Sequence, residues 1–93
     1  MRENQIDFNV DELYTAFLAL ESKEECSAFF KDLFSPGEIR SVAQRLEVAK
    51  MLDAGETFTE IEEKTGASSA TIARINRCLQ NGSGYRTVLE KIR

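Results

Sequence analysis

The most constraining feature of this sequence is residues 58–79, FTEIEEKTGASSATIARINRCL, which predict a helix, a tight turn and a second helix. Thr57 suits the cap of the first helix, because its hydroxyl can accept a backbone N–H while Glu60 reaches back to close a capping box. Gly66 suits the left-handed position that ends a helix, and Ser68 suits the cap of the next one. The stretch therefore predicts one helix on each side of Gly66.

The second helix of this motif, expected from Ser69 to about Leu79, has two unlike faces. Ile72, Ile75 and Leu79 recur at intervals of three and four residues and form an apolar stripe. The residues expected to contact DNA lie on the remaining surface or at its cap: Ser68, Ser69, Ala70, Thr71, Arg74 and Arg77. Short side chains allow a helix to approach the major groove, while hydroxyls and arginines meet phosphates and base edges. An ordinary structural corner between two helices is the alternative.

The distribution of charge is compatible with DNA binding despite a net charge of −4. Residues 1–35 hold three basic and eight acidic residues, whereas residues 36–93 hold nine basic and eight acidic ones. From Ala67 onward there are five basic residues, and Glu90 is the only acidic one. A local phosphate-binding face is therefore compatible with an acidic total, although solvated basic faces are also common.

Four more helices are expected around the motif. Start and stop signals place them at residues 10–20, 23–34, 36–54 and 85–93. Asn9 is the expected cap of the first, a capping box from Ser22 to Glu25 begins the second, and Ser35 caps the third. Gly55 should end the third helix, which carries a long apolar stripe. The sequence therefore predicts an all-α protein with a single domain over residues 1–93.

The apolar residues of the first two predicted helices are too many for so small a protein to cover easily. They include Leu13, Phe17, Leu18, Phe29, Phe30, Leu33 and Phe34. Each large apolar side chain contributes about 1.5–3 kcal/mol when it is fully buried, so exposure of several would be costly. An intertwined homodimer is the expected solution, and a monomeric six-helix domain is the alternative.

Several functional classes are disfavoured by the composition. The chain has no histidine, and its two cysteines, Cys26 and Cys78, are far apart, so no metal-ligand cluster or catalytic set is found. Both cysteines are expected to be reduced and partly buried. No apolar run approaches the roughly 18 residues of a membrane span, and no signal peptide is recognised at the start. We therefore expect a cytoplasmic protein that is not an enzyme.

Beyond these local patterns, the sequence resembles a known family. The segments that carry the resemblance are Leu33-Phe34-Ser35-Pro36-Gly37-Glu38-Ile39-Arg40, Arg45, Gly55-Glu56, Gly66-Ala67 and Ala70-Thr71-Ile72-Ala73-Arg74. Their spacing is similar to that of the Trp repressor family, and most of all to its poorly characterised Trp repressor-like branch, over about residues 12–93. The resemblance implies a six-helix, all-α protomer that interlocks with a second copy, with the helix-turn-helix at about residues 58–79.

The resemblance also implies an effector pocket between the central helices and the recognition helix. Two arginines that flank the corepressor ring in the family align with Arg45 and Arg74, and Ser35 and Cys78 would lie near the charged end of the ligand. Tryptophan-binding members have glycine where this chain has Ile75, and serine where it has Cys78. A sec-butyl group would occupy much of the slot, and a thiol is a weak hydrogen-bond partner. Either Ile75 substitutes for a ligand, or the corepressor is a small molecule other than tryptophan; Arg45 and Arg74 could instead contact only phosphates or carboxylates.

These observations lead us to expect a homodimeric, sequence-specific transcriptional repressor that binds double-stranded DNA. In helix-turn-helix dimers the two recognition helices enter successive major grooves, ~34 Å apart, on a roughly palindromic site. The alternative is a helical protein-interaction module that has lost DNA binding. Glu60, Glu62 and Glu63 favour that alternative, because carboxylates before the turn would repel phosphates if they faced the duplex.

Overall fold

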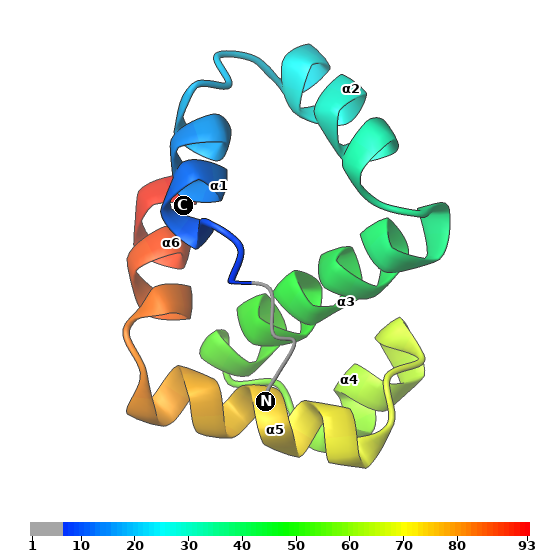
Figure 1. Ribbon diagram of the computed structural model, residues 1–93. Helices are drawn as coiled ribbons and strands as arrows, with labels where there is room; N and C mark the ends of the chain where they lie inside the picture. Colours follow the sequence, from blue (N-terminus) through cyan, green and yellow to red (C-terminus); the bar gives the residue numbers. More distant parts are fainter. Residues whose placement is uncertain (1–6) are drawn as a thin grey trace. The chain divides into compact units, whose positions relative to one another are not determined.

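The computed structural model describes residues 7–93, which form six α-helices and no strand. The helices are α1 Val10–Leu18, α2 Lys23–Leu33, α3 Pro36–Asp53, α4 Phe58–Thr65, α5 Ser69–Asn81 and α6 Gly84–Ile92 (Figure 1). The chain divides into two compact units, a first unit Met1–Ser35 and a second unit Pro36–Arg93. The predicted six-helix, all-α organisation is confirmed. No helix among the described residues is both long and apolar enough to cross a membrane.

The second unit is assembled around α3, which contacts α4, α5 and α6. Its buried side chains are all apolar: Val48, Ala49, Met51, Ile61, Ala67, Ile72, Ile75, Leu79 and Leu89. The predicted stripe on α5 is confirmed, because Ile72, Ile75 and Leu79 are only 0%, 3% and 1% exposed. This stripe packs in one core with Val48 and Ala49 of α3, which orients the rest of α5.

The end of α3 confirms the predicted stop at Gly55. Gly55 has a φ of +88°, the left-handed conformation that glycine adopts without steric cost. Its N–H donates to the carbonyl of Leu52 at 3.0 Å, and the N–H of Glu56 donates to the carbonyl of Met51 at 3.0 Å. These paired hydrogen bonds form a Schellman motif, which satisfies carbonyls that have no partner within the helix.

An acidic side chain at the end of α3 also ties α6 to the second unit. The Asp53 carboxylate accepts a hydrogen bond from Arg86 Nη1 at 3.2 Å and a second from Arg93 Nη2. Leu89, on the same helix as Arg86, is 3% exposed and belongs to the core. The last helix is therefore held by the apolar contacts of Leu89 and by the ion pair between Arg86 and Asp53.

The burial of α3 is less extensive than its sequence pattern predicts. The buried residues of α3 are confined to Val48, Ala49 and Met51. Val42, a predicted member of the apolar stripe, is 39% exposed, and Leu46 is half-buried. The difference arises because α4, α5 and α6 supply the core neighbours of the second half of α3.

The first unit is held by contacts between aromatic rings of α1 and α2. The ring centroid of Phe17 lies 5.8 Å from that of Phe29 and 5.7 Å from that of Phe30, and Phe30 lies 5.2 Å from Phe34. These distances are typical of stabilising aromatic pairs. Even so, no described residue of this unit is buried, and the Leu18 side chain is 85% exposed. The two helices therefore have no core of their own.

Helix bounds differ from the predicted ones by one or two residues. The first helix ends at Leu18 instead of residue 20, because the N–H of Leu20 turns to the carbonyl of Phe17 in a tighter bond at 3.2 Å. The second and third helices end one residue earlier than predicted, at residues 33 and 53. The helix α5 continues to Asn81, and the last helix spans residues 84–92. These shifts are of the size expected where helix ends fray.

Two local predictions require correction. Ser22 Oγ accepts the N–H of Glu25 at 3.0 Å as predicted, but Glu25 Oε1 accepts the N–H of Glu21 at 2.8 Å, so the reciprocal half of the capping box reaches one residue further back. Both cysteines are free thiols, and Cys26 is half-buried as predicted. The predicted partial burial of Cys78 is wrong: it is exposed, because it borders an open groove beside the core.

Candidate nucleic-acid interface

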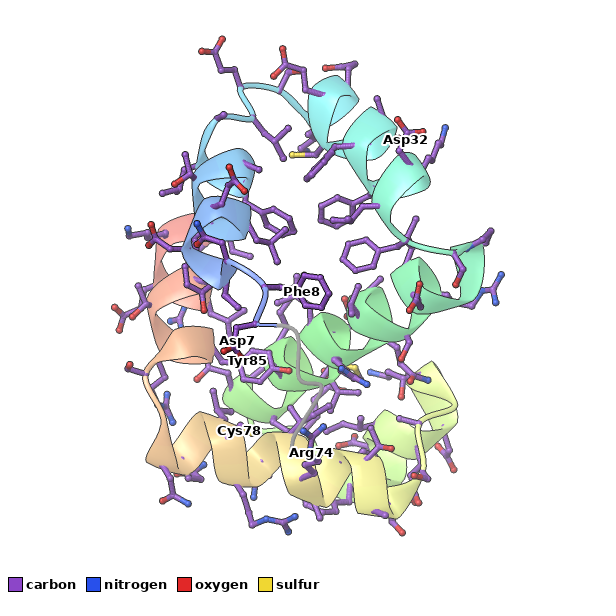
Figure 2. All side chains as sticks on the ribbon, in the orientation of Figure 1. Asp7, Phe8, Asp32, Arg74, Cys78 and Tyr85 are labelled. Carbon is purple, nitrogen blue, oxygen red and sulfur yellow. The ribbon has the colours of Figure 1, made fainter. Side chains whose placement is uncertain are left out.

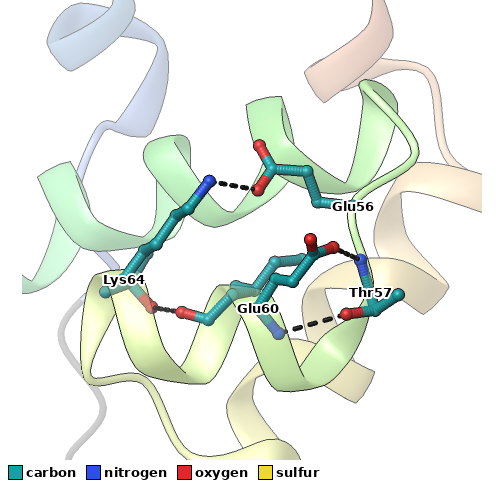
Figure 3. A network of polar contacts seen from close by, with 6 residues as sticks. Glu56, Thr57, Glu60 and Lys64 are labelled. Atoms are coloured by element: carbon teal, nitrogen blue, oxygen red, sulfur yellow. Dashed lines mark hydrogen bonds and ion pairs between the residues drawn. The ribbon is translucent and has the colours of Figure 1, made fainter.

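The first helix of the motif begins with the predicted capping box. Thr57 Oγ1 accepts the N–H of Glu60 at 3.1 Å, and Glu60 Oε1 accepts the N–H of Thr57 at 2.8 Å (Figure 3). Beside it, Lys64 Nζ donates to Glu56 Oε1 at 2.9 Å, joining the end of α4 to the loop before it. This bond raises the pKa of the Lys64 ammonium, because it favours the charged form. Both contacts hold the start of α4, and both are made between residues that are close in the sequence.

The turn between α4 and α5 is short and its polar groups are paired. Gly66 has a φ of +75°, and its N–H donates to the carbonyl of Glu62 at 2.9 Å. The Thr65 hydroxyl donates to the carbonyl of Ile61 at 2.7 Å and accepts the N–H of Ala67 at 3.1 Å. Ala67 is 5% exposed and anchors the turn in the core. The left-handed glycine predicted from the sequence is therefore present.

The first turn of α5 presents small side chains. Ser68 Oγ accepts the N–H of Thr71 at 3.1 Å and lies 3.0 Å from its hydroxyl, which confirms the predicted cap. Ser68, Ser69 and Ala70 are exposed, and Thr71 is half-buried. A surface of this kind lets backbone and hydroxyl groups come close to a groove wall.

Two arginines extend the same exposed surface of α5. Arg74 and Arg77 are both exposed, whereas Ile75 between them is buried (Figure 2 labels Arg74). All six residues predicted to contact DNA thus lie at the cap or on one helix, outside the apolar stripe. The cap and α5 thus carry hydroxyls, methyl groups and two guanidinium groups outside the buried stripe, which are groups that can contact phosphates and base edges.

Acidic residues lie close to this surface in the sequence. Glu63 on α4 is exposed and Glu62 is half-buried, and both precede the turn by a few residues. Carboxylates that face a duplex would weaken its binding by repelling phosphates. They are the strongest local feature against a DNA-contacting role.

The residues of the expected effector pocket are placed on different elements. Ser35 belongs to the first unit, Arg45 lies on α3, and Arg74, Ile75 and Cys78 lie on α5. Arg45, Arg74 and Cys78 are exposed, whereas Ile75 is 3% exposed and packs in the core. Position 75 is therefore occupied by a side chain that belongs to the core.

An apolar groove not foreseen from the sequence lies in the second unit. It has a volume of about 550 Å³ and is lined by Leu46, Cys78, Gly82, Gly84, Tyr85 and Val88. Its lining comes from α3, α5, α6 and the connection before α6, so no single stretch of sequence could reveal it. Of the five expected pocket residues, only Cys78 lines this groove.

No group of three or more potential metal-ligating side chains occurs within residues 7–93.

Comparison with known proteins identifies relatives along almost the entire chain. The family described as Trp repressor protein matches residues 8–93. The chain is 48% identical over 85 residues to the uncharacterized protein YerC of Bacillus subtilis strain 168. The aligned region covers 90% of this chain and 82% of that protein. It is 42% identical over 84 residues to the Trp operon repressor homolog of Chlamydia trachomatis serovar L2. That alignment covers 84% of this chain and 89% of that protein.

The fold has a counterpart among solved structures. The crystal structure of a TrpR-like protein from Eubacterium eligens matches with a TM-score of 0.86 at 48% sequence identity. The match covers 89% of this chain and 87% of the other.

The capping box predicts a specific dependence of stability on pH. The backbone hydrogen bond from Thr57 holds the pKa of Glu60 below its ordinary value of 4.5. The stabilisation is therefore present above pH 4.5 and is lost as the pH falls through the lower pKa of the folded state. Glu60→Gln keeps a neutral acceptor for the box, so its melting temperature should fall less than that of the wild type between about pH 5 and 3.

Thermal unfolding followed by circular dichroism measures this difference. Glu63→Gln, which removes an exposed carboxylate from the same helix, is the matched control and should follow the wild-type curve. Parallel pH curves for the wild type and Glu60→Gln would contradict the assigned role of the box.

Proposed function

The chain belongs to the Trp repressor family, and we propose that it is a homodimeric transcriptional repressor that reads DNA sequence with α5. This family consists of DNA-binding regulators and not of enzymes, so membership points to a regulatory role. The proposal places the protein in the cytoplasm, where its DNA target would be accessible.

One observation carries the assignment of α5 as the recognition helix. Its apolar stripe is buried against α3, while Ser69, Ala70 and both arginines remain exposed. A helix held by one face and polar on the other suits insertion into the major groove. Ser68, Ser69, Ala70 and Thr71 would approach the groove, and Arg74 and Arg77 would meet phosphates or base edges.

A second copy of the chain is proposed to complete the fold. None of the described residues of the first unit is buried, and Phe8, Tyr14 and Leu18 are 78%, 61% and 85% exposed. A segment of this size without a core is not stable by itself. In the second unit, Val88, which lines the apolar groove, is 47% exposed, and Ile92 is 57% exposed. We propose that the two copies interlock and cover these surfaces, so that residues 1–93 act as a single domain of the dimer.

We propose that tryptophan is not the corepressor of this protein. Of the two alternatives, burial of Ile75 in the core supports the one in which its side chain fills the slot. In that case DNA binding needs no added ligand. A corepressor other than tryptophan, bound near Arg45, Arg74 and Cys78, is the second alternative.

A protein-interaction module is the competing function. It is favoured by the exposed apolar side chains of the first unit and by the carboxylates of α4. The salt dependence of binding distinguishes the two functions, because phosphate contacts release counterions whereas an apolar interface does not.

Arg77→Ala should weaken DNA binding. If Arg77 contacts a phosphate, affinity should fall similarly for all sequences, and the salt slope should decrease by about one. If Arg77 reads a base, preference at one base pair should relax instead, at a cost of about 1–3 kcal/mol. Fluorescence anisotropy across a salt series measures both. Lys91→Ala, an exposed cation on α6, is the control, and unchanged affinity in Arg77→Ala would refute the assignment.

Leu18→Asp should break the dimer, because a charge placed in an apolar interface must lose its hydration. Sedimentation of the wild type should give about twice the protomer mass of 10.5 kDa, and the variant should dissociate or unfold. Ala28→Asp places the same charge at another exposed helical position and should leave the dimer intact. A wild type that sediments as a monomer at micromolar concentration would contradict the proposed dimer.

Ile75→Gly should create tryptophan binding if Ile75 fills an otherwise intact slot. Titration calorimetry should then detect heat with tryptophan for the variant and none for the wild type. Ile72→Ala removes core volume one turn earlier and should gain no binding. A folded Ile75→Gly protein that gives no heat would show that Ile75 alone does not close the pocket.

A further inference from the structure

One polar contact links α3 directly to the turn of the helix-turn-helix. Gln44 Nε2 donates a hydrogen bond to the backbone carbonyl of Thr65 at 3.0 Å, across 21 positions of sequence. The contact is partly buried and borders a hollow of about 340 Å³ between α3 and the end of α4. The Thr65 carbonyl is the last of α4, and the last four carbonyls of a helix have no partner within it. Gln44 therefore supplies a partner that α4 itself lacks.

The same residue, Thr65, also holds the next part of the turn. Its hydroxyl accepts the N–H of Ala67, and it donates to the carbonyl of Ile61. Ala67 is adjacent to Ser68, the first residue of the proposed DNA-contacting set, whose hydroxyl caps α5. Hydrogen bonds thus join the Gln44 amide to Thr65 and Thr65 to Ala67, which directly precedes the cap of α5 in the chain.

We propose that Gln44 is a positioning residue, which sets the placement of the recognition helix without touching DNA. This inference rests on the proposed function. The apolar stripe fixes α5 against α3 from Ile72 onward, but Ser68 to Thr71 precede the first buried stripe residue. Gln44 and Thr65 constrain that earlier segment. Groups that contact a ligand depend on such supporting hydrogen bonds to hold their geometry.

The chemistry of the contact accounts for the residue type. A backbone carbonyl needs a donor, which a glutamine amide supplies without introducing a charge beside a carbonyl. A glutamate at position 44 could not donate, and a methionine has similar length but no donor. Gln44→Met is therefore the informative substitution, since it removes the hydrogen bond while keeping much of the side-chain volume.

The test combines amide exchange with DNA binding, using the full-length protein and the DNA fragments that the wild type retains. In Gln44→Met the amides of Gly66 and Ala67 should exchange about threefold to tenfold faster, while that of Leu79 in the core is unchanged. DNA affinity should fall by about threefold to tenfold, with the salt slope unchanged because no phosphate contact is lost. Gln80→Met is the matched control, because that amide is exposed and faces Asn76 of its own helix at 3.5 Å.

A second pair of variants tests the other half of the chain of bonds. Thr65→Val keeps the shape of the side chain but removes the acceptor for the Ala67 N–H, so it should reproduce both effects of Gln44→Met. Thr65→Ser keeps the hydroxyl and should restore wild-type affinity and exchange.

Three results would overturn the proposal. The first is unchanged affinity in Gln44→Met when the wild type binds DNA. The second is acceleration of Leu79 exchange to the same degree as Ala67, which would reveal a general loss of stability. The third is unchanged Ala67 exchange in Gln44→Met. Failure of the wild type to bind DNA would refute the proposed function instead. In that case the faster exchange of the Gly66 and Ala67 amides in Gln44→Met would still be observed, because these hydrogen bonds do not depend on DNA.

Discussion

Burial of the α5 stripe is the interaction on which the rest of the second unit depends. Ile72, Ile75 and Leu79 share a core with Val48 and Ala49 of α3, and each is at most 3% exposed. Because a helix can bury only one face against this core, the small residues and arginines of α5 must face outward. The surface available for binding is therefore a direct consequence of packing. The turn at Gly66 then sets how α4 meets the helix.

The proposed interlocking with a second copy rests on a second constraint, which is that the first unit has no buried residue among residues 7–35. Its two helices hold each other through aromatic rings, yet none of its described residues is buried. The second unit also leaves Val88 and Ile92 exposed. In the proposed dimer these surfaces cover each other. Each recognition helix would then be held at a distance from its symmetry mate that the dimer defines, as reading of a palindromic site requires.

The parts of the structure that could be predicted from the sequence are those decided by neighbours in the chain. The capping box at Thr57, the left-handed Gly55 and Gly66, and the stripe of α5 all follow from residues within a few positions of one another. Contacts between residues far apart in the sequence could not be predicted in this way. The Gln44 bond to Thr65, the pairing of Asp53 with Arg86 and the groove that exposes Cys78 depend on how helices meet, so local periodicity gave no sign of them.

Capture of genomic DNA fragments by the purified protein tests whether α5 reads DNA sequence. The experiment is done at about physiological salt without any added ligand, and the retained fragments are sequenced. We expect enrichment of a roughly palindromic motif whose half-sites lie one DNA turn apart, and this enrichment should be lost when Arg74 and Arg77 are both replaced by alanine. Retention of random fragments alone, equal for the wild type and this double variant, would contradict a sequence-specific DNA-binding role for α5.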